Sequence, residues 1–238
     1  MKKFAQSIPV IAAFALSPSI VHAENTETKT DFIQQQLSQQ ADHSWTWQWG
    51  WFGFLGGTAV AQAVGSQVID EEERDMRYDM RVGAVKSFLG ATDMLLNPMK
   101  THRFAEELAN MPTETAEQKE EKLAAAEKFL EEAAKREAYE QSWVNHTLSG
   151  VVNLAGGALI AFDDDRPAAG LLDFAVGMLT SEIKIYTAPD TLNQTLAAYK
   201  RGDYESLTTK TAKKAATPKV QQWDIAAFGS NVSMSYQF

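Results

Sequence analysis

The carboxylate of Asp173 is the side chain in this sequence whose surroundings most suggest chemistry. Asp173 interrupts an apolar stretch, residues 171–176, and a carboxylate buried among apolar side chains is costly unless it is paired or protonated. His146 and Arg81, on other predicted helices, are the candidate partners. A buried structural hydrogen bond is the favoured interpretation of these polar residues. A hydrolase-type enzyme that uses Asp173 and His146 is the least favoured alternative.

No other motif predicts catalysis or metal binding. The chain has no cysteine, which excludes catalytic thiols and thiolate metal sites. His43, His102 and His146 are far apart and lack the spacing of a zinc site. The run Asp163–Asp165 lacks the alternating ligands and the glycine of a calcium loop, and there is no GxSxG nucleophile elbow. We therefore predict no catalytic residue, no metal and no cofactor.

Aromatic side chains offer a different kind of site, for an apolar ligand or a lipid. The stretch Ser44–Ile69 has no charged residue and contains four of the six tryptophans. These four tryptophans alternate along the chain, as on one face of a strand, whereas on a helix they form two pairs on opposite sides. The glycines that follow favour a helix. The predicted lining of an apolar site is Trp45, Trp49, Phe52 and Trp143.

The elements that position these residues follow a leader with the features of a bacterial secretory signal peptide. Lys2 and Lys3 precede a short apolar run, and Val21-His22-Ala23 fits a cleavage site. We therefore expect residues 1–23 to be removed. The formal net charge is −9 and becomes more negative without the two lysines, so nucleic acid is not an expected partner.

Apolar periodicity predicts one all-α domain over residues 24–205, a bundle of about four main helices in two αα-hairpins. A polar lead-in, residues 24–30, precedes the first helix. Small residues recur every four positions in this helix, at Gly53, Gly57, Ala61 and Gly65, which predicts close contact between helices. Further helices are predicted at 79–97, 115–162, 167–187 and 191–200. A capping box between Thr115 and Gln118 starts the second of these, and a bend is predicted in it near Gly156-Gly157.

The uncharged helices leave three interpretations open. Their length, tryptophans and small-residue stripe are typical of transmembrane helices. They also contain polar residues, including Gln48, Gln62 and Asp173, which favour a tightly packed bundle in water. Attachment at a membrane interface is the third interpretation.

The C-terminal part of the chain has a different composition. Residues 206–221 form a basic low-complexity stretch typical of a flexible linker, and residues 222–238 have the alternation and central turn of a β-hairpin. The run that ends at Phe238 resembles the C-terminal sorting signature of outer-membrane proteins. An exposed hairpin edge also permits strand addition to a partner. The predicted partner contacts are Trp223, Val232, Met234, Tyr236 and Phe238.

Together these features favour a non-enzymatic cell-envelope protein with a structural, scaffolding or assembly role. We expect it in the periplasm or associated with the outer membrane of a Gram-negative bacterium. Its expected partner is an envelope protein, and a β-rich protein would suit strand addition. The alternative is a helical module that binds an apolar small molecule or a lipid.

Overall fold

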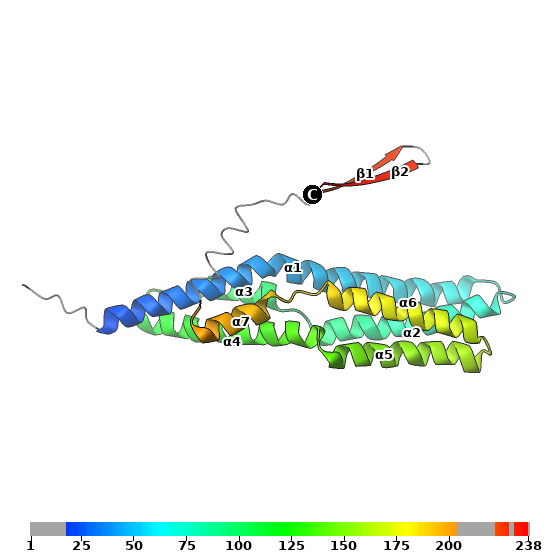
Figure 1. The fold of residues 1–238 in the computed structure, drawn as a ribbon, viewed down its shortest axis with the longest axis horizontal. Helices are drawn as coiled ribbons and strands as arrows, with labels where there is room; N and C mark the ends of the chain where they lie inside the picture. The colour runs from blue at the N-terminus through cyan, green and yellow to red at the C-terminus, as the bar shows by residue number, and fades with distance from the viewer. Residues whose placement is uncertain (1–17, 204–221, 229–230, 238) are drawn as a thin grey trace, which may run out of the picture.

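The computed structural model describes residues 18–203, 222–228 and 231–237, with side chains described from Asn25 to Asp203. Within the bundle the chain is entirely helical (Figure 1), which confirms the predicted all-α class. Most of the predicted leader, the predicted linker at 206–221 and the terminal Phe238 lie outside the described residues. The helices are α1 (Pro18–Val68), α2 (Arg74–Leu96), α3 (Thr101–Ala109), α4 (Ala116–Glu140), α5 (Trp143–Ala158), the π-helical turn η1 (Leu159–Asp163), α6 (Pro167–Tyr186) and α7 (Thr191–Arg201).

Helix α1 is longer than predicted. Residues 24–30 were predicted to form a polar lead-in that precedes the first helix. This is wrong, because α1 already includes these residues and buries Thr26 and Thr30. The tryptophans lie on a helix and form the two expected pairs on opposite sides. Trp47 is only 5% exposed, whereas Trp45 is 51% exposed.

The helix predicted over residues 115–162 is two helices. The capping box between Thr115 and Gln118 starts α4 as predicted, but α4 ends at Glu140. The hydroxyl of Ser142 then accepts a hydrogen bond from the backbone N–H of Asn145 and starts α5, because serine at this position satisfies a free donor of the new helix. Gly156 and Gly157, where a bend was predicted, lie near the end of α5, and the π-helical turn η1 follows directly after it.

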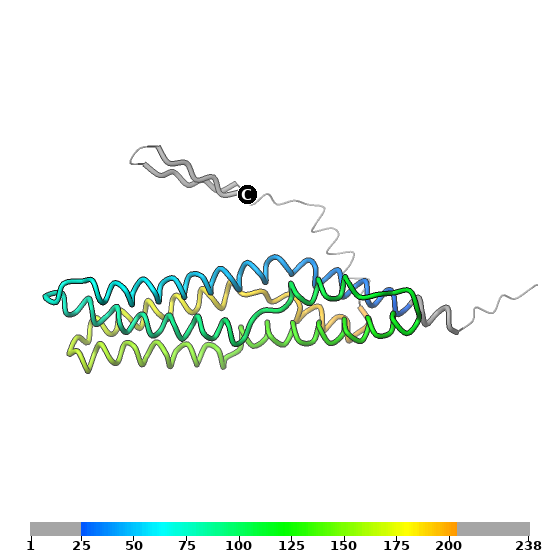
Figure 2. The backbone as a smooth tube through the Cα atoms, turned by 180° about the vertical axis from the view of Figure 1, so that it is seen from behind, coloured from blue at the N-terminus to red at the C-terminus, as the bar shows by residue number. Residues whose placement is uncertain are grey.

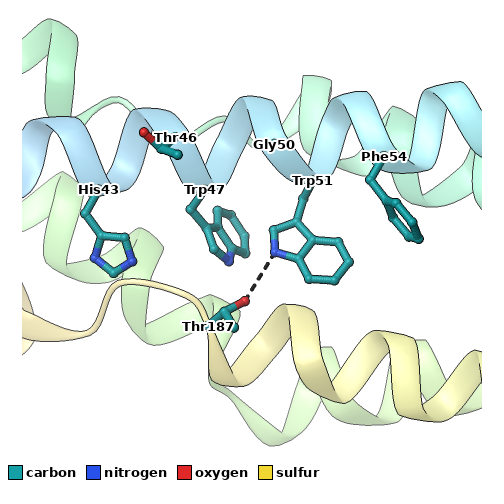
Figure 3. Close-up of a pocket in the computed structure, with 7 residues that line it drawn as sticks. All are labelled: His43, Thr46, Trp47, Gly50, Trp51, Phe54 and Thr187. Carbon is teal, nitrogen blue, oxygen red and sulfur yellow. Dashed lines mark hydrogen bonds between the residues drawn. The ribbon is translucent and has the colours of Figure 1, made fainter. Parts of the chain in front are cut away.

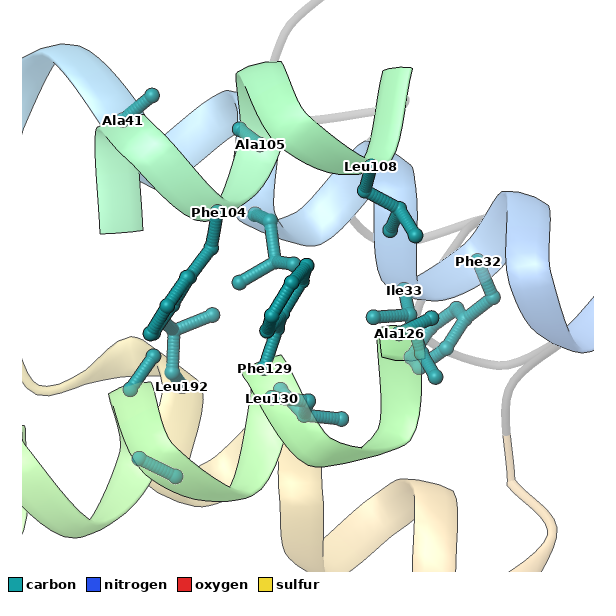
Figure 4. Packing of buried hydrophobic residues seen from close by; sticks show 13 residues of the cluster. Phe32, Ile33, Ala41, Phe104, Ala105, Leu108, Ala126, Phe129, Leu130 and Leu192 are labelled. Carbon is teal, nitrogen blue, oxygen red and sulfur yellow. The ribbon is translucent and has the colours of Figure 1, made fainter. Parts of the chain in front are cut away.

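The helices form two halves along the long axis of the bundle (Figures 1 and 2). In the first, which we call the polar half (residues 25–44, 97–142 and 187–203), the start of α1 packs against α3, α4 and α7. A cluster of buried side chains fills this half (Figure 4), in which Phe104 and Phe129 stack with ring centres 4.5 Å apart. This is the usual interior of a water-exposed helical domain.

The second half, which we call the apolar half, consists of residues 45–96 and 143–186. Here the rest of α1 packs antiparallel on α2, and α5 packs antiparallel on α6. The helix α2 ends just before Asn97-Pro98, as expected since proline disfavours helical geometry at the residue before it.

Two strands are described after the bundle. β1 (Gln222–Phe228) pairs antiparallel with β2 (Asn231–Gln237), and Trp223 lies opposite Tyr236. In this register Val232, Met234 and Tyr236 occupy alternate positions of β2 and therefore share one face of the pair.

Candidate functional site

The surface of the apolar half is covered by large hydrophobic side chains. Among residues 25–203, every exposed large hydrophobic side chain lies in this half, and none lies in the polar half. We call this set of side chains the apolar belt. Soluble proteins expose single hydrophobic residues, whereas large exposed apolar patches are typical of surfaces that contact a partner or a lipid phase. The belt includes Phe54, Val60 and Val64 on α1, Phe88, Leu89 and Leu96 on α2, Leu148, Val151 and Leu154 on α5, and Leu171, Val176 and Leu179 on α6.

The interior of the apolar half contains polar as well as apolar side chains. Lys86 Nζ on α2 lies 2.7 Å from Asp173 Oδ2 on α6, and the two side chains are only 15% and 21% exposed. The amide of Asn153 on α5 donates to the hydroxyl of Ser181 on α6 at 3.1 Å. Met94 and Ile160 are buried in the same half, and the polar half also buries carboxylates. The two halves therefore differ in their surfaces rather than in the polarity of their interiors.

Glycines make room for these polar side chains. A Cβ atom on Gly156 would lie 2.5 Å from Lys86 Cδ, and one on Gly177 would collide with Asn153 Oδ1. The close contacts predicted for the small-residue stripe of α1 are wrong at Gly53 and Gly57, where an added Cβ would meet nothing within 4 Å, whereas a Cβ on Gly65 would meet the side chain of Met80. Two backbones do approach each other between α5 and α6. A Cβ on Gly157 would lie 2.5 Å from the carbonyl oxygen of Gly170, so α5 and α6 touch at this point.

Charged groups close the end of the apolar half that lies far from the polar half. Arg166, just before α6, forms ion pairs with Asp79 on α2 and with the buried Asp164. The hydrogen bond to Asp79 is the main reason why the pKa of Arg166 is raised above its ordinary value. Arg74 also pairs with Asp164 at 2.8 Å. Within the run Asp163–Asp165, Asp164 is thus buried, and its ion pairs link the start of α2 to the turn before α6.

A second charged cluster lies where the two halves meet. The carboxylate of Glu140, at the end of α4, binds both Arg136 and Lys184. Burial raises the pKa of Glu140, but the two cations outweigh burial and lower it below the ordinary value. His146 Nδ1 on α5 lies 3.0 Å from Glu182 Oε1 on α6, close in sequence to this cluster. Charged clusters thus lie at both ends of the apolar belt.

A groove opens between α1 and the C-terminal end of α6 (Figure 3). It has a volume of about 460 Å³ and lies at the boundary between the two halves. Trp47 and Trp51 project into it from α1, and Thr187 closes its other side. The lining is His43, Thr46, Trp47, Gly50, Trp51, Phe54 and Thr187.

The structure does not bring the four residues of the predicted apolar site to this groove. Trp45 and Trp49 lie on the other side of α1 and are exposed, and Trp143 is exposed on α5. Phe52 is partly buried and packs beside Trp47 in a small cluster. The spacing separated the tryptophans into two pairs, but it did not reveal which pair faces α6.

The predicted polar residues are also placed apart. Asp173 pairs with Lys86 rather than with His146 or Arg81, since His146 faces Glu182 and Arg81 is exposed. Sequence reasoning missed Lys86. A signal was present, because Lys86 lies four residues after Val82 and four before Gly90, on the inward face of α2. In the part of the chain whose side chains are described, no three His, Asp or Glu residues form a metal-binding group.

Comparison with protein-family models, with curated proteins and with solved structures finds no match for this chain. Its function must therefore be argued from its own residues. None of the described helices is both long enough and apolar enough to cross a membrane.

Proposed function

We propose that this is a non-enzymatic, membrane-associated protein of the cell envelope, in which the apolar belt contacts phospholipid acyl chains and the polar half carries a structural or scaffolding role in water. The observation that supports this proposal is the apolar surface of this half. Exposed large hydrophobic side chains lie on its outside, while Lys86 and Asp173 form an ion pair within it.

The distribution of the belt around the bundle favours lipid over a protein partner. Each of α1, α2, α5 and α6 contributes exposed hydrophobic side chains, and polar contacts join α2, α5 and α6 within the bundle. A protein partner or a second copy of the chain would cover one face of the bundle and leave the others in water. Acyl chains at a membrane interface can contact side chains of several helices without any helix crossing the membrane, and burial of apolar surface is favourable by roughly 25 cal/mol per Å².

The finer features of the chain fit the same role. The proposed unit of the apolar half is a pair of αα-hairpins, α1 with α2 and α5 with α6. The strand pair β1–β2 would offer an edge to a β-rich envelope protein by strand addition, with Trp223, Val232, Met234, Tyr236 and Phe238 as the contacts. Removal of residues 1–23 would accompany export to the periplasm or the outer membrane.

Vesicle flotation tests the lipid contact. The full-length chain is mixed with phosphatidylcholine vesicles and centrifuged through a density gradient, and we expect it to rise with the vesicles. A triple variant with Leu148→Gln, Val151→Gln and Leu154→Gln removes three side chains of the belt from α5 and should float much less.

A matched control uses exposed alanines of the polar half. Ala109→Gln and Ala124→Gln change side chains that lie outside the belt and should leave flotation unchanged. Wild-type protein that stays at the bottom of the gradient, or a triple variant that floats as wild type does, would contradict the proposal.

A further inference from the structure

The indole N–H groups and the Thr187 hydroxyl that line the groove between α1 and α6 are already bonded. Trp47 Nε1 donates to the carbonyl oxygen of Lys184 at 3.1 Å, and Trp51 Nε1 donates to Thr187 Oγ1 at 3.2 Å. The Thr187 hydroxyl is itself bonded to the backbone of α6. An occupant therefore meets the ring of Trp51 and the small exposed part of Trp47, with no indole N–H left to donate.

The groove is kept open by Gly50. A Cβ atom added to Gly50 would meet nothing within 4 Å, so this position of α1 borders empty space rather than a neighbouring helix. His43, Trp47, Gly50 and Phe54 follow one another at spacings of three and four and so share one face of α1, and Thr46 lies three residues after His43. The groove has a volume of about 460 Å³ and is open to solvent along its length.

The two ends of the groove differ in polarity. His43 brings an imidazole to the end next to the polar half, and Thr46 lines the same end from the edge of α1 farther from α6. Phe54, at the other end, is 55% exposed and belongs to the apolar belt, so the groove is continuous with the belt. None of the lining residues is an aspartate, glutamate, lysine or arginine. This lining is complementary to an uncharged hydrocarbon chain that carries a polar head at one end.

We propose that the groove binds the acyl chain of a single amphiphile, with the chain along Trp51 and Phe54 and the polar head near His43 and Thr46. The proposal rests on the proposed function, because the amphiphile would enter from the lipid phase around the belt. Tryptophans that present an apolar body beside a polar boundary are typical of such interfaces. A free fatty acid and a phospholipid share this chemistry, and experiment can distinguish them.

Filling the groove tests the proposal directly. Gly50→Leu places a side chain in the empty space beside Trp47 and Trp51, and leucine favours a helix more than glycine does, so the variant should fold. Gly53→Leu is the matched control, since Gly53 also has nothing within 4 Å and does not line the groove. Purified full-length protein would be incubated with oleate or with oleoyl lysophosphatidylcholine, and the bound amphiphile measured by native mass spectrometry.

We expect wild type and Gly53→Leu to retain one molecule of at least one probe, and Gly50→Leu to lose at least tenfold in bound fraction. Retention of oleate alone assigns a fatty-acid site, and retention of the lysophospholipid assigns a phospholipid site. Equal binding by Gly50→Leu and Gly53→Leu, or no binding of either probe by wild type, would overturn the proposal. Gly50→Leu leaves the belt unchanged, so it should still float with vesicles if the proposed function is right. Loss of amphiphile binding without loss of flotation is then specific to the groove.

Discussion

Lys86 on α2 and Asp173 on α6 form an ion pair, with Nζ and Oδ2 2.7 Å apart, inside the half of the bundle whose surface is apolar. The pair joins the α1–α2 part of this half to the α5–α6 part. Gly156 and Gly177 provide the space through which the lysine reaches its partner. The small-residue positions of α5 and α6 thus serve a polar connection as well as close helix packing.

Breaking this ion pair should destabilise the protein more than removing it entirely. Lys86→Met or Asp173→Leu leaves one charge without its partner, and we expect each to lower the free energy of unfolding by up to about 3 kcal/mol. The double variant should be more stable than either single variant, because no unpaired charge remains inside. Denaturant unfolding of the four proteins measures the difference, and strictly additive losses would contradict this interpretation of the pair.

The contact between Gly157 and Gly170 should not tolerate a methyl group. Gly157→Ala would bring a Cβ to 2.5 Å from the backbone carbonyl of Gly170, and because backbone cannot move aside as a side chain does, we expect a loss of about 1–3 kcal/mol. Gly150→Ala on the same helix meets nothing within 4 Å. It should stabilise the helix by up to about 1 kcal/mol, and thermal unfolding that ranks these two variants in the opposite order would refute the contact.

Glu137 should make stability fall as pH rises. Burial raises the pKa of Glu137 from 4.5 to about 7, although the backbone N–H of Leu192 binds its carboxylate. Between these two pH values the folded protein binds more protons than the unfolded chain, so the free energy of unfolding decreases with rising pH, by up to about 3 kcal/mol.

The variant Glu137→Gln keeps an acceptor for Leu192 and cannot ionise. We expect its stability to vary less between pH 4.5 and 7 than that of wild type in pH-dependent denaturation. Glu132→Gln, an exposed position on the same helix, is the control and should retain the wild-type pH dependence. If the free energy of unfolding of Glu137→Gln fell with pH as steeply as that of wild type, a group other than Glu137 would cause the pH dependence.

The capping box at the start of α4 should contribute measurably to stability. Thr115 accepts a hydrogen bond from the backbone N–H of Gln118 at 3.2 Å, and the Gln118 side chain accepts one from the backbone of Thr115. Thr115→Ala should cost about 1 kcal/mol. Thr113→Ala, two residues earlier and outside the helix, should cost much less, and equal effects of the two substitutions would contradict the role of the cap.

Local signals predicted much of the fold. The end of α2 at Asn97-Pro98 and the start of α4 at Thr115 with Gln118 were predicted correctly. Each of these two signals acts only on neighbouring residues of the chain, so it can be recognised without knowledge of the fold. The break at Ser142 was missed because alanine and glutamate run almost to it, and Ser142 signals a new helix only when the preceding helix is known to end. Helix boundaries set by a single cap within helix-favouring sequence are hard to predict from pattern alone.

The site was harder to predict because it depends on which helix faces which. Trp45 and Trp47 are alike in sequence, but distant residues such as Met94 and Ala188 pack around Trp47 and bury it, whereas Trp45 stays exposed. Asp173 was recognised as a polar residue in an apolar setting, but its partner Lys86 lies 87 residues away on α2. Long-range pairings of this kind are not encoded in local periodicity.

Site-directed spin labelling tests the lipid contact of the apolar belt most directly. The chain has no cysteine, so single cysteines can carry a nitroxide at Phe88, Val176 or Leu154, on three different helices of the belt, and at Glu132 of the polar half as control. The labelled full-length protein in phosphatidylcholine vesicles would be exposed to oxygen, which concentrates in hydrocarbon, and to a water-soluble nickel chelate. We expect the three belt labels to collide mainly with oxygen and the label at position 132 to collide mainly with nickel. Belt labels that collide with nickel as often as the control does would contradict the proposed lipid contact.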